Sequence, residues 1–187
     1  EWVTNAAGYS YHNWYGFGAI DIDAAINLAE NYPMDNYDCD NIYNCSYNLG
    51  LFASTGEVSS SFTPGQYFDY NSYLDWPITV TEHEHRSSTR ETWLNEKVEF
   101  VRVNIYGEID YMPAMGLRLQ SPSGTIVNIL QPFTNISHYT DYMNFDIGVS
   151  AFYGEDLAGQ WTLMVDDYLD DGLSGKIYQW KIEIYGN

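Results

Sequence analysis

The segment FYGEDLAGQWTLMVDDYLDDGLSGKIYQWKIEIYG, which runs from Phe152 to Gly186, decides the fold class of this chain. It contains two runs in which apolar and polar side chains alternate, GQWTLMVDD from Gly159 and KIYQWKIEIYG from Lys176. Alternation with a period of two is typical of β-strands that bury one face. We therefore predict two strands joined by an acidic connection. That connection carries four aspartates, Asp166, Asp167, Asp170 and Asp171.

The same pattern recurs through the chain from about Ala53 onward. PITVTEHEH and KVEFVRVNIYG both alternate, and the second run assigns Val98 and Phe100 to one face and Val101 and Val103 to the other. GLRLQSPSGTIVNIL has the form of a hairpin with a Ser-Pro-Ser-Gly turn. No helical pattern of useful length appears in this half. The prediction is a mainly β fold, a jelly-roll sandwich of about eight strands.

Composition limits the classes of partner. The 187 residues are 45% hydrophobic, which is typical of a globular chain, and 17% aromatic, which suits strands. Seven basic and 26 acidic residues give a net charge of −19. Such a surface repels phosphate backbones and anionic lipid, so we expect no nucleic acid partner and no membrane partner. The same surface attracts cations.

The first third of the chain is different. IDIDAAINLAENYP places Ile22 and Ile26 on one helical face, with Asp21 as N-cap and Pro33 as the stop, so we predict a helix over about residues 21–31. Residues 34–52 show little alternation and form a predicted linker. Within it, Cys39 and Cys45 lie too far from further Cys or His for a metal site, so we predict a disulfide and an extracellular location. Two free thiols in a cytosolic protein are the alternative.

Three segments together resemble a known family. Residues 1–32 carry a Trp, an Asn-x-x-Gly, a Tyr-Gly-Phe-Gly and an Asp before an Ala-rich helix, and they resemble the end of a kexin- or furin-type subtilisin-like catalytic domain. LRLQSPSGTIVNIL, FYGEDLAGQWTLMVDD and GKIYQWKIEIYG resemble strands of the P domain that follows it, and the acidity resembles bacterial members. One departure is Gly172-Leu173, where the family often has Gly-Asp shortly before Gly-x-Leu. The resemblance implies three parts: 1–33 as the end of the catalytic domain, 34–52 as linker, and 53–187 as P domain.

The sequence offers no recognisable catalytic machinery. The family's Gly-Thr-Ser-x-Ala, His-Gly-Thr and Asp-(Ser/Thr)-Gly motifs are missing, and the resemblance places Glu1 beyond the catalytic serine. His12 and His138 have no supporting motif, and His83 with His85 forms a metal pair or, more simply, an exposed strand end. Glu155 and Asp156 resemble the family's structural Gly-Glu-Asp turn before the Trp161 strand. We therefore expect this segment to be inactive alone, whatever the parent enzyme does.

Calcium is the predicted cofactor, because it prefers closely spaced carboxylates on loops. A solvated acidic turn and a solvated linker are the alternatives. The candidate ligands are Asp166, Asp167, Asp170 and Asp171 in the acidic connection and Asp35, Asp38 and Asp40 in the linker.

Two functions remain open at this point. In the first, the chain is the P domain of a secreted subtilisin-like serine endopeptidase, where it stabilises and regulates the catalytic domain and contacts protein substrates. In the second, it is a carbohydrate- or collagen-binding jelly-roll module on a secreted hydrolase. The second function would use a platform of tyrosines at positions 67, 70, 73, 139, 142 and 153.

Overall fold

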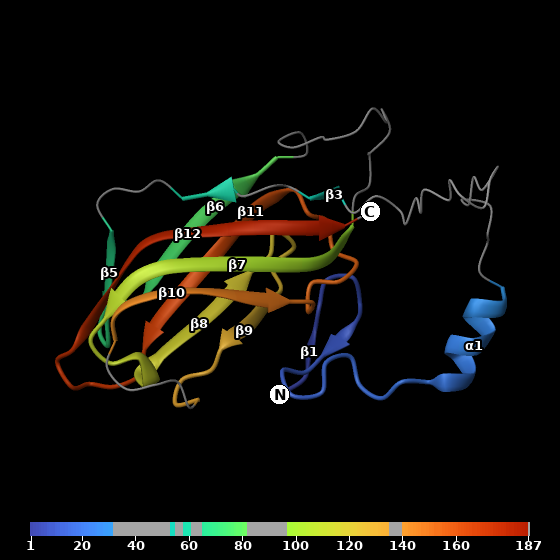
Figure 1. Cartoon of the computed structure of the whole chain (residues 1–187), viewed down its shortest axis with the longest axis horizontal. Helices are drawn as coiled ribbons and strands as arrows, with labels where there is room; N and C mark the ends of the chain where they lie inside the picture. Colours follow the sequence, from blue (N-terminus) through green and yellow to red (C-terminus); the bar gives the residue numbers. More distant parts are fainter. Residues whose placement is uncertain (32–52, 55–57, 61–64, 82–96, 135–139, 187) are drawn as a thin grey trace, which may run out of the picture.

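The computed structural model describes residues 1–31, 53–54, 58–60, 65–81, 97–134 and 140–186. Two antiparallel sheets pack face to face (Figure 1). The four-stranded sheet has the order β6 (Leu74–Val80), β11 (Gly159–Asp167), β8 (Met115–Gln120) and β9 (Ile126–Leu130). The six-stranded sheet contains β10 (Thr140–Val149), β7 (Val98–Ile109) and β12 (Ser174–Gly186) in that order.

The free edge of β12 is paired by three short strands in turn. They are β3 (Ala53–Ser54), β4 (Val58–Ser59) and β5 (Gln66–Asp69). The predicted mainly β sandwich is therefore confirmed. Its six and four strands exceed the expected number, about eight, because one long edge is shared among short segments.

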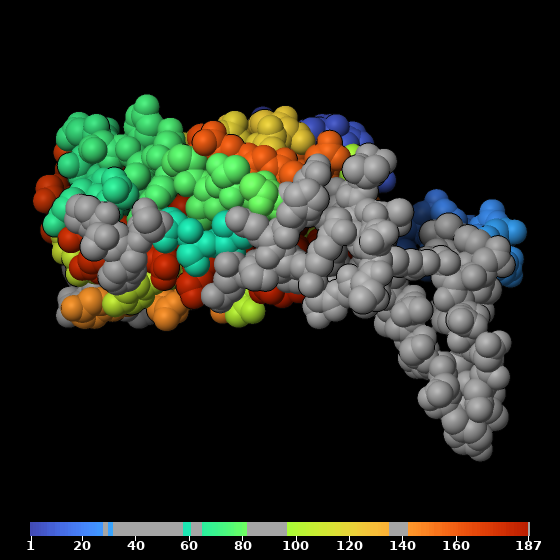
Figure 2. Space-filling model, turned by 90° about the horizontal axis from the view of Figure 1, so that it is seen from above, coloured from blue at the N-terminus to red at the C-terminus, as the bar shows by residue number. Residues whose placement is uncertain are grey.

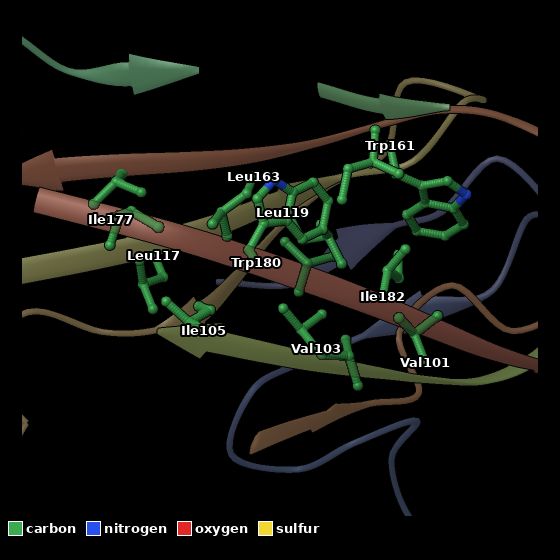
Figure 3. Packing of buried hydrophobic residues seen from close by; sticks show 14 of the residues in the cluster. Val101, Val103, Ile105, Leu117, Leu119, Trp161, Leu163, Ile177, Trp180 and Ile182 are labelled. Carbon is green, nitrogen blue, oxygen red and sulfur yellow. The ribbon is translucent and has the colours of Figure 1, made fainter. Parts of the chain in front are cut away.

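The core lies between the two sheets, where apolar faces from both meet (Figure 3). Trp161 and Trp180, one from each sheet, are both 0% exposed. The indole N–H of Trp161 donates to the carbonyl of Leu157 at 2.9 Å. The indole N–H of Trp180 has no hydrogen-bond partner among the described residues. The two tryptophans are thus equally buried but differ in polar satisfaction.

One face assignment in β7 was wrong. Val98 is fully buried although alternation places it with exposed Phe100. The pairing with β12 shifts by one residue here, since Phe100 lies opposite Tyr185 and Val98 lies opposite Gly186. A bulge of this kind turns the following side chain to the other face.

Residues before the sandwich form a small hairpin and a helix. β1 (Val3–Thr4) pairs with β2 (Ser10–Tyr11), and α1 spans Ile22–Glu30. Asp21 caps α1 as predicted, its Oδ1 accepting from the Ala24 N–H at 2.9 Å. A further short 3-10 helix, η2, covers Met112–Ala114. In the part of the chain that the structure describes, no helix has the length and apolarity to cross a membrane.

Candidate functional site

The four aspartates predicted for the acidic connection have different environments: Asp166 and Asp167 end β11, and Asp170 and Asp171 lie between β11 and β12. Asp166 Oδ2 accepts from Arg118 Nε at 3.0 Å and from Nη2 at 2.8 Å, so its charge is paired across the sheet. Asp171 Oδ1 accepts from the Leu173 N–H at 2.9 Å and thereby closes a turn. Asp170 is exposed. Asp166 and Asp171 thus each accept hydrogen bonds from protein donors.

Asp167 is in a less favourable environment. Burial raises the pKa of its carboxyl, and the nearby charges of Asp171 and Asp69 raise it further, while the bond from the Leu169 N–H lowers it. Within the described ranges, no three Asp, Glu, His or Cys side chains are placed to hold one metal ion. A calcium site in this connection stays a prediction. Asp35, Asp38, Asp40, Cys39 and Cys45 lie outside the described residues.

The histidines provide no catalytic arrangement in the described ranges. His12 Nδ1 accepts from the Trp14 N–H at 3.1 Å, and its Nε2 lies 3.2 Å from the amino group of Glu1. Its ring also packs near Trp2 and Tyr15. His12 therefore organises a local turn. The other three histidines, His83, His85 and His138, lie outside the described residues.

Glu155 and Asp156 have separate environments. Glu155 is 2% exposed, and it accepts hydrogen bonds from the hydroxyls of Ser121 and Thr125 and, at 3.0 Å, from the Ala6 N–H. Asp156 is mostly exposed and pairs with Lys97 at 2.6 Å. The two carboxylates do not share a cleft, as a catalytic pair would. Their environments agree with the structural role expected for the Gly-Glu-Asp turn.

Asn5 extends the contact that Glu155 begins. Its Nδ2 donates to the carbonyls of Ala151 and Tyr153, both at 2.9 Å, and its Oδ1 accepts from the Tyr9 N–H. Asn5 is 4% exposed, although the residues around it are largely exposed. Residues 1–18, which we name the N-terminal strap, are thus held on the sandwich by buried polar contacts. Figure 2 shows the strap in dark blue beside the yellow and orange segments of the sandwich.

Aromatic rings line the same contact. The Tyr9 and Phe17 rings of the strap lie 5.2 Å and 6.1 Å from the Tyr153 ring between centroids, both in edge-to-face geometry. Gly154 makes room for this approach, because a Cβ there would lie 2.9 Å from the Tyr9 ring. At the far side, Asn13 Nδ2 donates to the carbonyl of Asn128 in β9 at 2.8 Å. The strap therefore contacts the sandwich through side chains and backbone together.

Beyond these contacts, the strap and α1 expose a run of large apolar side chains. Five of them are between 53% and 84% exposed, and α1 lies beyond the end of the sandwich in both views (Figures 1 and 2). Ile22 and Ile26 share one helical face. Five large apolar side chains exposed within residues 14–26 are more than scattered single exposures, and such exposure favours a surface that a partner covers. The five side chains are Trp14, Tyr15, Ile20, Ile22 and Ile26.

The structure distributes the tyrosines of the predicted platform over several places. Tyr67 and Tyr142 are on exposed positions of the six-stranded sheet, and Lys176 Nζ lies 4.7 Å above the Tyr67 ring. Tyr153 belongs to the strap contact, Tyr70 and Tyr73 flank the β5–β6 turn, and position 139 is outside the described residues.

Tyr178, a neighbour that the sequence analysis did not single out, lies on the same sheet as Tyr67. A hydrogen bond with Glu108, assisted by partial burial, raises the pKa of Tyr178 to about 12. The Lys176 ammonium also lies 5.0 Å from the Tyr178 ring centroid, so one cation covers both rings. The Tyr67 and Tyr178 rings therefore contact the Lys176 side chain of the same sheet.

Sequence reasoning missed the strap contact as a site. It quoted Asn5 and the Gly-Glu-Asp turn for the resemblance alone, because nothing local shows that they touch. The only available signal was chemical: an acidic residue next to a strand run and a Ser-x-x-x-Thr turn that supplies two hydroxyls, at Ser121 and Thr125.

Comparisons with known proteins agree with this architecture. Residues 98–184 match the proprotein convertase P-domain family. The whole chain is 22% identical to Candida albicans kexin and covers 19% of its length. The chain is also 27% identical to the extracellular serine protease of Aeromonas sobria. This match includes 89% of the chain and covers 25% of that protein.

The crystal structure of the Aeromonas sobria serine protease superposes with a TM-score of 0.72 at 21% identity, over 100% of this chain and 33% of that one. This likeness concerns the fold. The chain spans a quarter or less of the length of these two curated relatives. The family match therefore assigns residues 98–184 to the proprotein convertase P-domain family, homologous to the corresponding regions of kexin and of the Aeromonas protease.

Proposed function

We propose that this chain is the P domain of a secreted subtilisin-like serine endopeptidase, joined to the last segment of its catalytic domain, and that it stabilises that domain without supplying a catalytic residue. The strap would belong to the catalytic domain and the sandwich to the P domain. Secretion is supported by the extracellular relative from Aeromonas sobria and by the strongly acidic composition.

The observation that carries the proposal is the exposed apolar run on the strap and α1. Full burial of each large aliphatic side chain in this run would contribute about 1.5–3 kcal/mol of favourable free energy. The strap that bears this run is anchored to the sandwich by Asn5 and Glu155. A catalytic domain that covered the run would therefore be linked to the sandwich through a fixed connection. This arrangement suits a stabilising domain.

Calcium is the second part of the proposal. A cation that binds only the native state stabilises it in proportion to its concentration. The net charge of −19 and the mutual repulsion of Asp167, Asp171 and Asp69 support cation binding somewhere on this surface. Through such a site, ion concentration would regulate the stability of the protease.

The experiment uses the parent polypeptide and this chain side by side. We expect a Gly-Thr-Ser-x-Ala motif upstream of Glu1 in the parent. The double variant I22D/I26D should shorten the thermal half-life of the parent's peptidase activity, since both side chains would lose apolar cover. In the 187-residue chain the same variant should leave the unfolding temperature unchanged, because both side chains are exposed there. N27D, on the same helix, is the polar control.

Two results would count against the proposal. One is a parent without the serine motif. The other is an I22D/I26D parent that is as stable as the N27D parent. Saturable binding of a soluble polysaccharide or of collagen by the 187-residue chain, together with that second result, would favour the binding-module alternative.

A further inference from the structure

Glu155 is unusual among the acidic residues that the structure describes, because it is almost completely buried. Its described hydrogen-bond donors are two hydroxyls and one backbone N–H, and none of them is a cation. A buried carboxylate is costly unless hydrogen bonds replace its hydration. Such a group persists in a fold where several donors converge on it, and the origin of those donors therefore matters.

Two of the donors belong to the sandwich. Ser121 and Thr125 flank the β8–β9 turn, which is closed by bonds from the Ser121 N–H to the Thr125 carbonyl at 2.9 Å and from the Gly124 N–H to the Ser121 carbonyl at 3.0 Å. Gly124 has a φ of 89°, a value that suits glycine. The turn thus presents both hydroxyls from one side. A hydroxyl can also accept a hydrogen bond instead of donating one, so the two hydroxyls do not by themselves require a carboxylate.

The third donor is a backbone N–H of the strap, which can donate a hydrogen bond but cannot accept one. The Ala6 N–H lies 3.0 Å from Glu155 Oε1 and 3.0 Å from Thr125 Oγ1. The preceding residue, Asn5, donates to the carbonyls of Ala151 and Tyr153, which lie just before Glu155 in the chain. Two consecutive strap residues therefore meet one compact polar site on the sandwich, with acceptors for both.

We propose that Glu155 is a positioning residue: its carboxylate, with Ser121, Thr125 and the carbonyls of Ala151 and Tyr153, forms a site on the sandwich that binds the strap at Asn5 and Ala6. The site determines where the first part of the strap, at Asn5 and Ala6, is held on the sandwich. The contact itself is independent of the proposed function. Only the identification of the strap as the end of a catalytic domain rests on the proposed function.

The key comparison is between two substitutions of Glu155. In Glu155→Gln, the amide oxygen can accept from Ala6 and Thr125, and its NH₂ can donate to the Ser121 hydroxyl, which reverses its role. In Glu155→Met, a side chain of similar length offers no acceptor. Amide hydrogen exchange in the 187-residue chain should then be faster at Ala6 and Tyr9 by roughly tenfold to a hundredfold in Glu155→Met. In Glu155→Gln it should change by less than about threefold.

Controls distinguish release of the strap from unfolding of the sandwich. The amides of Leu163 and Ile182, in the middle of β11 and β12, should keep their protection in both variants. A separate variant, Asn5→Ala, loosens the strap from its own side and leaves the Glu155 site unaltered. It should accelerate exchange at Ala6 as Glu155→Met does.

Each outcome decides the matter. The proposal is supported if the Ala6 amide exchanges faster in Glu155→Met but not in Glu155→Gln, while the Leu163 amide stays protected. The proposal is overturned if the exchange rate of the Ala6 amide is unchanged in Glu155→Met. It is also overturned if the rate rises equally in both Glu155 variants. If Glu155→Met accelerates Leu163 as well, Asn5→Ala decides: release of Ala6 alone supports the proposal, and an unchanged Ala6 overturns it. None of these results tests the protease assignment, which has its own experiment.

Discussion

The two core tryptophans allow a sharp test of how polar satisfaction contributes to the stability of this sandwich. Trp161 and Trp180 are both 0% exposed, but only the Trp161 indole N–H has a partner, the Leu157 carbonyl, among the described residues. We compare W161F with W180F. Both substitutions remove the same atoms from the same core, so the loss of apolar contact and the cavity that remains are similar.

The polar contributions have opposite signs. W161F leaves the Leu157 carbonyl without its donor in a residue that is 4% exposed, which costs about 1–3 kcal/mol. W180F removes a buried N–H that has no described partner, and this offsets the cavity by about 1–3 kcal/mol. W161F should therefore be less stable than W180F by about 2 kcal/mol or more. For a chain of this size, the unfolding temperatures should differ by about 4–8 °C.

Equilibrium unfolding in urea, followed by far-UV circular dichroism, measures both free energies. Fluorescence is unsuitable because the variants change the emitting residues. W2F, at a side chain that is 51% exposed, is the control for a tryptophan outside the core and should change stability little. If W180F loses as much stability as W161F, or more, the buried indole N–H of Trp180 is not the cost assigned to it here.

Four further predictions concern packing, charge and calcium. Gly175→Ala should destabilise by about 1–3 kcal/mol in thermal unfolding, since the new Cβ would lie 2.2 Å from the buried Phe68 ring, whereas Gly124→Ala meets no atom and reports only backbone strain. Asp167 has a raised pKa, so its contribution to stability falls as pH rises from 3.8 through that raised value, and D167N should stabilise at pH 7 but not below pH 3.8. Asp146 has a pKa lowered by hydrogen bonds from Arg102 and Asn104, so D146N should destabilise at pH 7 and lose its effect in acid; parallel pH profiles for the two variants would contradict this assignment. Millimolar Ca²⁺ should raise the unfolding temperature more than Mg²⁺ does, and replacing the four aspartates of the acidic connection by asparagine tests whether that connection is responsible; equal effects of the two ions would speak against calcium binding.

Much of the sandwich was predictable because its strands carry their own local signal. Alternation in GQWTLMVDD and KIYQWKIEIYG predicted the two strands that the structure shows as β11 and β12. The N-cap of α1 was equally readable, since Asp21 precedes the helix and its side chain reaches an N–H three residues on. In each case the physical cause acts within a few residues, so the sequence alone contains it.

The bulge at Val98 and the three short strands on the edge of β12 depend instead on pairing between distant segments. No local pattern specifies which edge is free or where two strands lose register. The pairing of Asp166 with Arg118 is of the same kind, because 48 residues separate them and only the β8–β11 register brings them together.

Composition and alternation were enough to predict an acidic, mainly β sandwich in which two of the strands each carry a tryptophan. The role of Glu155, in contrast, depends on long-range contacts that only the folded chain forms. Its importance comes from Ala6, 149 residues away, and from hydroxyls of a turn about 30 residues away. A buried carboxylate is stable only where such donors converge, and that convergence is a property of the packed chain.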